Sequence, residues 1–100
     1  MSNRSKMHYT NNRLKRFLIE NGWKHFNLFP HSRFSKDYHL EDCDFDAFAF
    51  KDRTIWFFQF KTNKKCTKKM LLKYKRLENK YRIKCAWMNR TRGNIEFSRN

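Results

Sequence analysis

The chain has 100 residues, which is enough for one domain built around one modest hydrophobic core. Lysine and arginine number 24 against 9 aspartate and glutamate residues, and the formal net charge of +15 predicts an anionic partner, most commonly nucleic acid. No run of about 18 apolar residues and no apolar signal segment occurs, which argues against a membrane span and against secretion. We therefore expect a cytoplasmic protein without a membrane partner. Aromatic residues make up 18% of the chain, so it can fold, unlike a disordered basic tail.

The first half of the chain is expected to begin with a flexible basic arm over residues 1–9. Polar residues 10–12 can cap a helix that ends at Asn21-Gly22, where glycine tolerates a left-handed backbone. The apolar stripe of this helix consists of Leu14, Phe17 and Leu18. A strand over residues 23–29 and a loop over residues 30–43 should follow, and long loops of this kind are often functional.

Two runs rich in phenylalanine, isoleucine and tryptophan, residues 45–50 and 54–61, have the length and composition of strands. Only a short polar segment separates them, so they predict a β-hairpin. The three tryptophans of the chain, Trp23, Trp56 and Trp87, are expected in the core or an interface.

Residues 67–82 switch to a helical period. Their apolar stripe comprises Met70, Leu71, Tyr74, Leu77 and Tyr81. Strands are expected at 83–88 and 94–97, joined by a turn at Arg92-Gly93. The order helix, three strands, helix, two strands predicts a single α/β domain over residues 10–100, with a central mixed β-sheet flanked by two helices.

The cysteines Cys43, Cys66 and Cys85 are odd in number and widely spaced, which favours reduced thiols over disulfides. Structural zinc needs paired ligands a few residues apart, and neither the cysteines nor the four histidines provide such a pair.

The hairpin predicts a cluster of polar side chains on one face of the sheet. If Asp52-Arg53 forms the turn, Asp46 lies opposite Gln59 and Asp44 lies opposite Lys61. Opposite side chains share a sheet face, with Cβ atoms about 5 Å apart, so these four residues should converge. The other face would then carry the core residues Phe45, Ala47, Ala49, Trp56, Phe58 and Phe60.

Such a cluster suits the hydrolysis of phosphodiester bonds. Asp46 supplies a carboxylate and Gln59 a carbonyl oxygen to a hard cation such as Mg²⁺ (or Mn²⁺), with Asp44 a further candidate ligand. Lys61 would steady the nucleophile or the charge that develops on the phosphate. The alternative is a solvent-facing ion pair between Asp44 and Lys61 beside two merely polar residues, and geometry alone favours neither interpretation.

The pattern Asp46-x12-Gln59-x-Lys61, on a hairpin that follows a helix, resembles the signature of the PD-(D/E)XK nuclease superfamily. The likeness is closest to the archaeal Holliday-junction resolvases, and it covers residues 45–61 without gaps as well as the order of elements. The resemblance implies a restriction-endonuclease-like core and a metal-dependent DNA endonuclease. It further implies catalytic roles for Asp46, Gln59 and Lys61, branched or duplex DNA as substrate, a role in DNA recombination, and a homodimer.

The chain departs from this family at two places. Gln59 replaces an acidic metal ligand, and residues 10–13, where the resolvases carry a glutamate in their first helix, include no acid. Glu20 lies at the far end of that helix, although Glu41, Asp42 or Asp44 could restore a ligand. These departures favour the alternative of a catalytically degenerate nucleic-acid-binding protein with the same fold. A second alternative is an RNA-binding accessory protein with an unrelated fold.

Basic residues flank the predicted site on both sides. We expect nucleic-acid contacts from Arg33 and Lys36 in the long loop, and from Lys64, Lys65, Lys68 and Lys69 after the hairpin. The alternative is a solvated basic face. The abundance of lysine, asparagine and phenylalanine hints at an AT-rich genome, such as that of a virus or phage.

Overall fold

The computed structural model of the chain describes residues 3–29, 39–40, 43–92 and 94–98. The elements are helix α1 (Asn3–Glu20), strands β1 (Lys24–Leu28), β2 (His39–Leu40), β3 (Cys43–Asp44), β4 (Ala47–Lys51) and β5 (Thr54–Thr62), helix α2 (Lys68–Tyr81), and strands β6 (Lys84–Thr91) and β7 (Asn94–Ser98).

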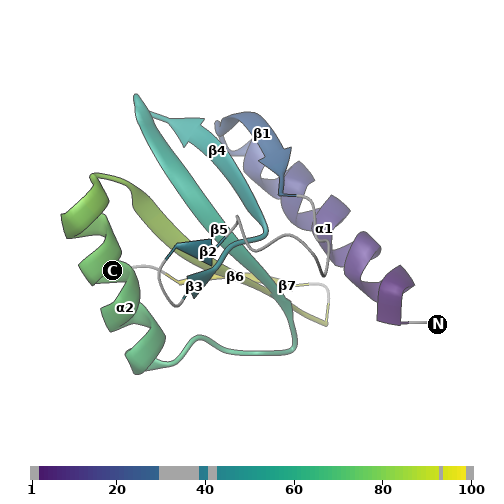
Figure 1. The fold of residues 1–100 in the computed structure, drawn as a ribbon. Coiled ribbons are helices and arrows are strands. Elements are labelled where there is room, and N and C mark those ends of the chain that lie inside the picture. The colour runs from purple at the N-terminus through teal and green to yellow at the C-terminus, as the bar shows by residue number, and fades with distance from the viewer. Residues whose placement is uncertain (1–2, 30–38, 41–42, 93, 99–100) are drawn as a thin grey trace.

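Five of the strands form one mixed sheet in the order β1-β4-β5-β6-β7 (Figure 1). Strands β5 and β6 run parallel and are joined through α2, whereas the other neighbours are antiparallel. Helix α1 covers one face of the sheet and α2 the other. The predicted α/β architecture, with a mixed sheet flanked by two helices, is confirmed, and a restriction-endonuclease-like identity of this core stays a prediction.

The β4–β5 hairpin has the predicted turn and register. Lys51 pairs with Thr54, and both turn residues have positive φ, 54° at Asp52 and 64° at Arg53. Two successive left-handed residues define a type I′ turn, whose twist matches that of the flanking strands. The pairing continues to Ala47 opposite Phe58.

Helix α1 begins at Asn3, so the expected cap at residues 10–12 is wrong, and residues 3–9 belong to the helix rather than to an arm. The segment contains neither glycine nor proline, and nothing in it interrupts a helix once tertiary contacts hold it. The predicted end is confirmed. Trp23 N–H donates to the Leu18 carbonyl at 3.0 Å across Gly22, whose φ is +95°, which is a Schellman ending.

Helix α2 matches the predicted range within a residue. The Thr67 hydroxyl accepts from Met70 N–H at 3.1 Å and caps its start, while Arg82, with φ 56°, ends it in the left-handed conformation. Tyr74 and Leu77 are buried as predicted. Tyr81 is 41% exposed, so its place in the buried stripe was wrong. Tyr81 is the last residue of the helix, so no following helical turn covers its side chain.

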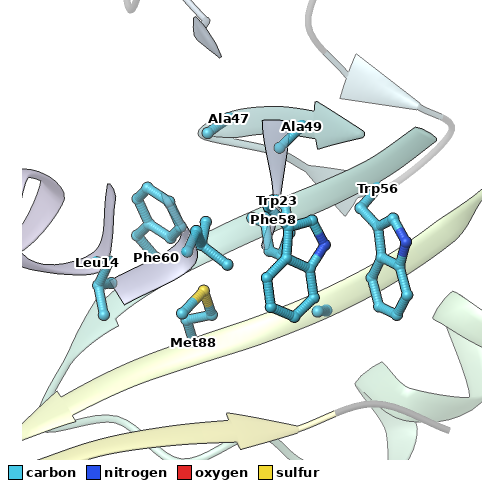
Figure 2. Packing of buried hydrophobic residues seen from close by; sticks show 10 residues of the cluster. Leu14, Trp23, Ala47, Ala49, Trp56, Phe58, Phe60 and Met88 are labelled. Atoms are coloured by element: carbon cyan, nitrogen blue, oxygen red, sulfur yellow. The ribbon is translucent and has the colours of Figure 1, made fainter. Parts of the chain in front are cut away.

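The larger core lies between α1 and the sheet (Figure 2). Its buried residues are Leu14, Leu18, Trp23, Ala47, Ala49, Trp56, Phe58, Phe60, Ala86 and Met88. Leu14, Phe60 and Met88 gather at one end of this core and Trp56 lies at the other, where it packs edge-to-face on Trp23 with ring centroids 5.6 Å apart. Burying each large apolar side chain contributes about 1.5–3 kcal/mol, so this face is a main source of stability.

The smaller core lies between α2 and the opposite sheet face. Its buried residues are Cys43, Phe45, Tyr74, Leu77, Ile83, Cys85 and Trp87. Phe45 was expected on the other face beside Ala47, but its ring lies 5.7 Å from that of Tyr74. The prediction failed because the chain bends at Asp46, which breaks the strand alternation between Phe45 and Ala47. All three tryptophans are buried, as predicted.

The predicted loop 30–43 contains a short second ladder. Strands β2 and β3 pair antiparallel, with His39 opposite Asp44 and Leu40 opposite Cys43. At the sheet edge, the β1–β4 register shifts between Lys24 and Asn27, around His25 with its φ of 56°. The three cysteines are free. Neither α1 nor α2, as far as the described residues go, is long and apolar enough to cross a membrane.

Candidate functional site

Asp46 lies at the bend between β3 and β4, where its backbone joins the main sheet on both sides. Its N–H donates to the Phe58 carbonyl at 2.8 Å, and its carbonyl accepts from Phe29 N–H at 2.9 Å. Its carboxylate oxygen Oδ2 accepts from Phe60 N–H at 2.7 Å. The carboxylate thus takes a donor of β5 that a neighbouring backbone carbonyl would otherwise satisfy. This short, charge-assisted bond fixes the carboxylate beside residue 59.

Gln59 lies on β5 next to that hydrogen bond and faces α2. Its side chain is 9% exposed, and its Oε1 accepts from the Tyr74 hydroxyl at 3.3 Å. Burial raises the pKa of Tyr74, and the neighbouring thiols and then the Asp46 charge raise it further. The hydroxyl therefore stays protonated at neutral pH and can only donate to the Gln59 oxygen while this bond holds. Sequence reasoning assigned Tyr74 to the core alone, and its period on α2 gave no sign of this polar contact.

Lys61 is two residues further along β5, so it projects from the same sheet face as Gln59. Its side chain is partly buried, and its Nζ lies 5.8 Å from the centroid of the Trp87 ring. An ammonium group over an aromatic face is attracted by the ring quadrupole. Gln59 and Lys61 therefore lie on one face of β5, and the Asp46 carboxylate, from the bend before β4, is bonded to Phe60 N–H between them. The predicted pairing of Asp46 with Gln59 lies beyond the last pair of the ladder, Ala47 with Phe58, and a joint site of the three residues stays a prediction.

Asp44 is not the strand partner of Lys61. The prediction placed it opposite Lys61, but it lies in β3 and pairs with His39. The ladder between β4 and β5 ends at Ala47, because the bend at Asp46 takes the preceding residues out of the main sheet. Within the described ranges, no three histidine, cysteine or acidic side chains form a group able to hold a metal. Glu41 and Asp42 lie outside the described residues.

The loop after β5 is held on β6 by the backbone of Lys64. Lys64 N–H donates to Asn89 Oδ1 at 2.9 Å, and the Trp87 indole N–H donates to the Lys64 carbonyl at 2.9 Å. Asn89 is 2% exposed, and its amide nitrogen also donates to Thr91 Oγ1 at 3.0 Å and to Glu96 Oε2 at 3.3 Å. Asn89 was not predicted as a site residue, although a polar residue directly after the apolar run of β6 was a usable signal.

The predicted basic residues after the hairpin surround this fixed loop. Lys64, Lys65, Lys68 and Lys69 are all exposed. The first turn of α2 contains no acidic residue, so nothing there offsets the two lysines that oppose the helix dipole. The positive charge of these four lysines is therefore concentrated at the start of α2, where the free backbone N–H groups of the first turn also point. Arg33 and Lys36, the other two predicted contacts, lie outside the described residues.

No protein-family model, curated protein or solved structure matches the chain. The likeness to PD-(D/E)XK nucleases therefore depends on the spacing of Asp46, Gln59 and Lys61 and on the order of elements.

Proposed function

We propose that the chain is a metal-dependent endodeoxyribonuclease with a catalytic site at Asp46, Gln59 and Lys61. The observation that carries the proposal is the hydrogen bond from Phe60 N–H to the Asp46 carboxylate. It holds an acidic side chain against β5 at Phe60, the residue between Gln59 and Lys61. A net charge of +15 supplies the general attraction to DNA.

The donor set fits Mg²⁺ or Mn²⁺. Asp46 and Gln59 offer a carboxylate and an amide carbonyl, which are hard oxygen ligands, and Mg²⁺ often binds through one or two carboxylates while keeping several waters. When bound, such an ion supplies a Lewis acid that polarises the scissile phosphate. Gln59 Oε1 would hold the ion through the lone pair that the Tyr74 hydroxyl, 3.3 Å away, does not use.

Lys61 acts on the substrate directly in this proposal. Its ammonium group carries three donors that can bind non-bridging phosphate oxygens and stabilise the charge that develops on them. The nearby Trp87 ring restricts the position of the ammonium group without neutralising it. The exposed lysines of the following loop would hold the flanking phosphates, and the Lys64 backbone contacts keep that loop in place.

A second candidate function is DNA binding without cleavage, and one observation favours it. Gln59 is largely buried, and its oxygen already accepts the Tyr74 hydroxyl. A buried amide that is satisfied within the protein has less to gain from a metal. In that case the basic loop would still bind phosphates, and Asp46 would serve the sheet through Phe60 N–H.

Cleavage assays on labelled four-way-junction, single-stranded and linear duplex DNA separate the two candidates. The wild type, Asp46→Asn and the charge-matched Asp52→Asn at the exposed hairpin turn would each be tested with Mg²⁺ and Mn²⁺. We expect metal-dependent cutting by the wild type and by Asp52→Asn, none by Asp46→Asn, and a preference for the junction. DNA binding without cutting under either metal would contradict the nuclease and support the second candidate.

We also propose a homodimer, because symmetric cleavage of a four-way junction needs two sites. Light scattering after size exclusion should give twice the chain mass of 12.6 kDa. A mass of one chain, both free and on DNA, would contradict this part of the proposal alone.

A further inference from the structure

A hollow of about 540 Å³ opens at the ends of the two parallel strands, β5 and β6, where their chains leave the sheet. Its lining consists of Thr62, Asn63, Arg90, Thr91 and Arg92. The carboxyl ends of parallel strands are a common place for ligands in α/β proteins. Every lining side chain can donate a hydrogen bond, two are guanidinium groups, and none of the five is acidic.

The basic wall of this hollow is positioned by helix α1. Arg90 Nε donates to the Thr10 hydroxyl oxygen at 3.2 Å, and that oxygen lies 2.6 Å from the hydroxyl oxygen of Thr62. Thr10 is 3% exposed, so the Arg90 guanidinium is bound through its Nε to a buried hydroxyl. A guanidinium group fixed in this way loses less conformational freedom when it binds an anion than a free surface lysine does.

The hollow lies at the end of the sheet, where Thr62 and Arg90 belong to the sheet face opposite the candidate catalytic residues, while the Thr91 hydroxyl accepts from Asn89 on the other face. Thr62 and Arg90 contact α1, whereas Lys61 and Asn89, their neighbours along the strands, face α2. It is therefore a separate site, which the basic residues predicted from the sequence did not include. A second hollow, of about 440 Å³, lies at the β4–β5 turn, but Asp52 is part of its lining, and Lys51 there already donates to the Asn21 carbonyl.

We propose that the hollow lined by Arg90 and Arg92 binds a backbone phosphate of the DNA, at a distance from the cleavage site. Planar guanidinium groups bind phosphate oxygens through paired N–H donors, and the threonine hydroxyls and the Asn63 amide complete a donor set without a negative charge. The contact would anchor one DNA strand on the α1 side of the β-sheet, while another DNA strand lies against the α2 side. The inference rests on the proposed DNA substrate, but not on cleavage.

The test uses DNA binding in EDTA, where no metal-dependent cutting occurs, at a series of salt concentrations. Each phosphate contact contributes about 0.9 to the slope of log affinity against log salt concentration. Arg92→Gln should therefore lower the slope by about 0.9. The control is Arg53→Gln, which removes the same charge from another exposed turn residue with a left-handed backbone, and its slope should equal that of the wild type.

Two further arms identify the ligand and the group that binds it. Arg90→Lys keeps the charge but loses the planar donor pair, so it should weaken binding more than Arg53→Gln does. The mononucleotide dTMP, followed by amide chemical shifts of Thr62 and Asn63, should bind far more weakly than a duplex oligonucleotide.

Equal slopes for Arg92→Gln and Arg53→Gln would overturn the phosphate site and leave the nuclease proposal standing. Tight dTMP binding at the hollow, with an unchanged DNA slope in Arg92→Gln, would assign it to small phosphate esters and overturn the DNA contact. Slopes that differ as expected, in a protein that never cuts DNA, would support the site while contradicting the nuclease. Failure of the wild type to bind DNA would overturn both proposals.

Discussion

Replacing Asp46 separates its structural role from its proposed catalytic one. The Asp46→Ala change removes the acceptor for Phe60 N–H, and no water can fully replace a 2.7 Å bond that is partly buried within the sheet. A buried donor left without a partner costs about 1–3 kcal/mol. For a domain of this size that corresponds to a melting temperature lower by about 5–20 °C. Urea unfolding followed by tryptophan fluorescence measures the loss.

The Asp46→Asn change keeps an oxygen in the same place and loses only the charge. A neutral acceptor gives a hydrogen bond about 1 kcal/mol weaker than a charged one, so this variant should keep most of the stability. Cleavage should nevertheless be lost, because a neutral amide is a poor ligand for a hard divalent cation. If Asp46→Ala unfolds at the same urea concentration as the wild type, the bond to Phe60 N–H does not stabilise the sheet, and the argument from it to a fixed carboxylate fails.

Three other predictions follow from the polar contacts of the α2 face. Tyr74→Phe leaves the Gln59 oxygen without its donor and should cost about 1–2 kcal/mol in urea unfolding, yet tighten Mn²⁺ binding in calorimetry if the hydroxyl competes with the ion. Asn89→Ala leaves Lys64 N–H without its acceptor, so hydrogen exchange at that amide should become at least tenfold faster, and an unchanged rate would show that the loop is held otherwise. Burial raises the pKa of Cys85 from 9.0 to about 12, so its thiol ionises in the unfolded chain before it does so in the folded one. The free energy of unfolding should then be unaffected below pH 9 and fall as the pH rises towards 12, and Cys85→Ala should reduce this dependence.

The sequence predicted the hairpin well because its register depends on local chemistry. Once Asp52 and Arg53 are the turn, the pairing of every following residue is determined, and strand alternation assigns the faces of β5. The predicted positions of Asp44 and Phe45 were wrong because they continued the β4–β5 pairing past Asp46, where the chain bends. The bend depends on the backbone hydrogen bonds of Asp46 to Phe58, in β5, and to Phe29, the residue after β1.

The start of α1 and the polar contacts across the sheet were beyond prediction for a related reason. Thr10 reads as a helix cap in the sequence, but its hydroxyl bonds to Thr62 and Arg90, and the latter is 80 residues away. Tyr74 likewise reads as a core residue until its hydroxyl is placed against Gln59. Local pattern predicts which residues are buried, whereas the partners of a buried polar group depend on elements that are distant in the chain.

The contacts of α1 also have a consequence for how the chain folds during synthesis. Leu14 and Leu18 pack in the same core as Phe58 and Phe60 of β5 and as Ala86 and Met88 of β6, and Thr10 is bonded to Thr62 and Arg90, so α1 finds its partners in strands that follow it by about 40 to 80 residues. Contacts of such long sequence separation slow folding, because the loop entropy is lost before they form. The apolar stripe of α1 should therefore stay exposed on the ribosome until β5 has emerged and be fully covered only once β6 follows, and that interval is when the nascent chain is most open to aggregation or to a chaperone.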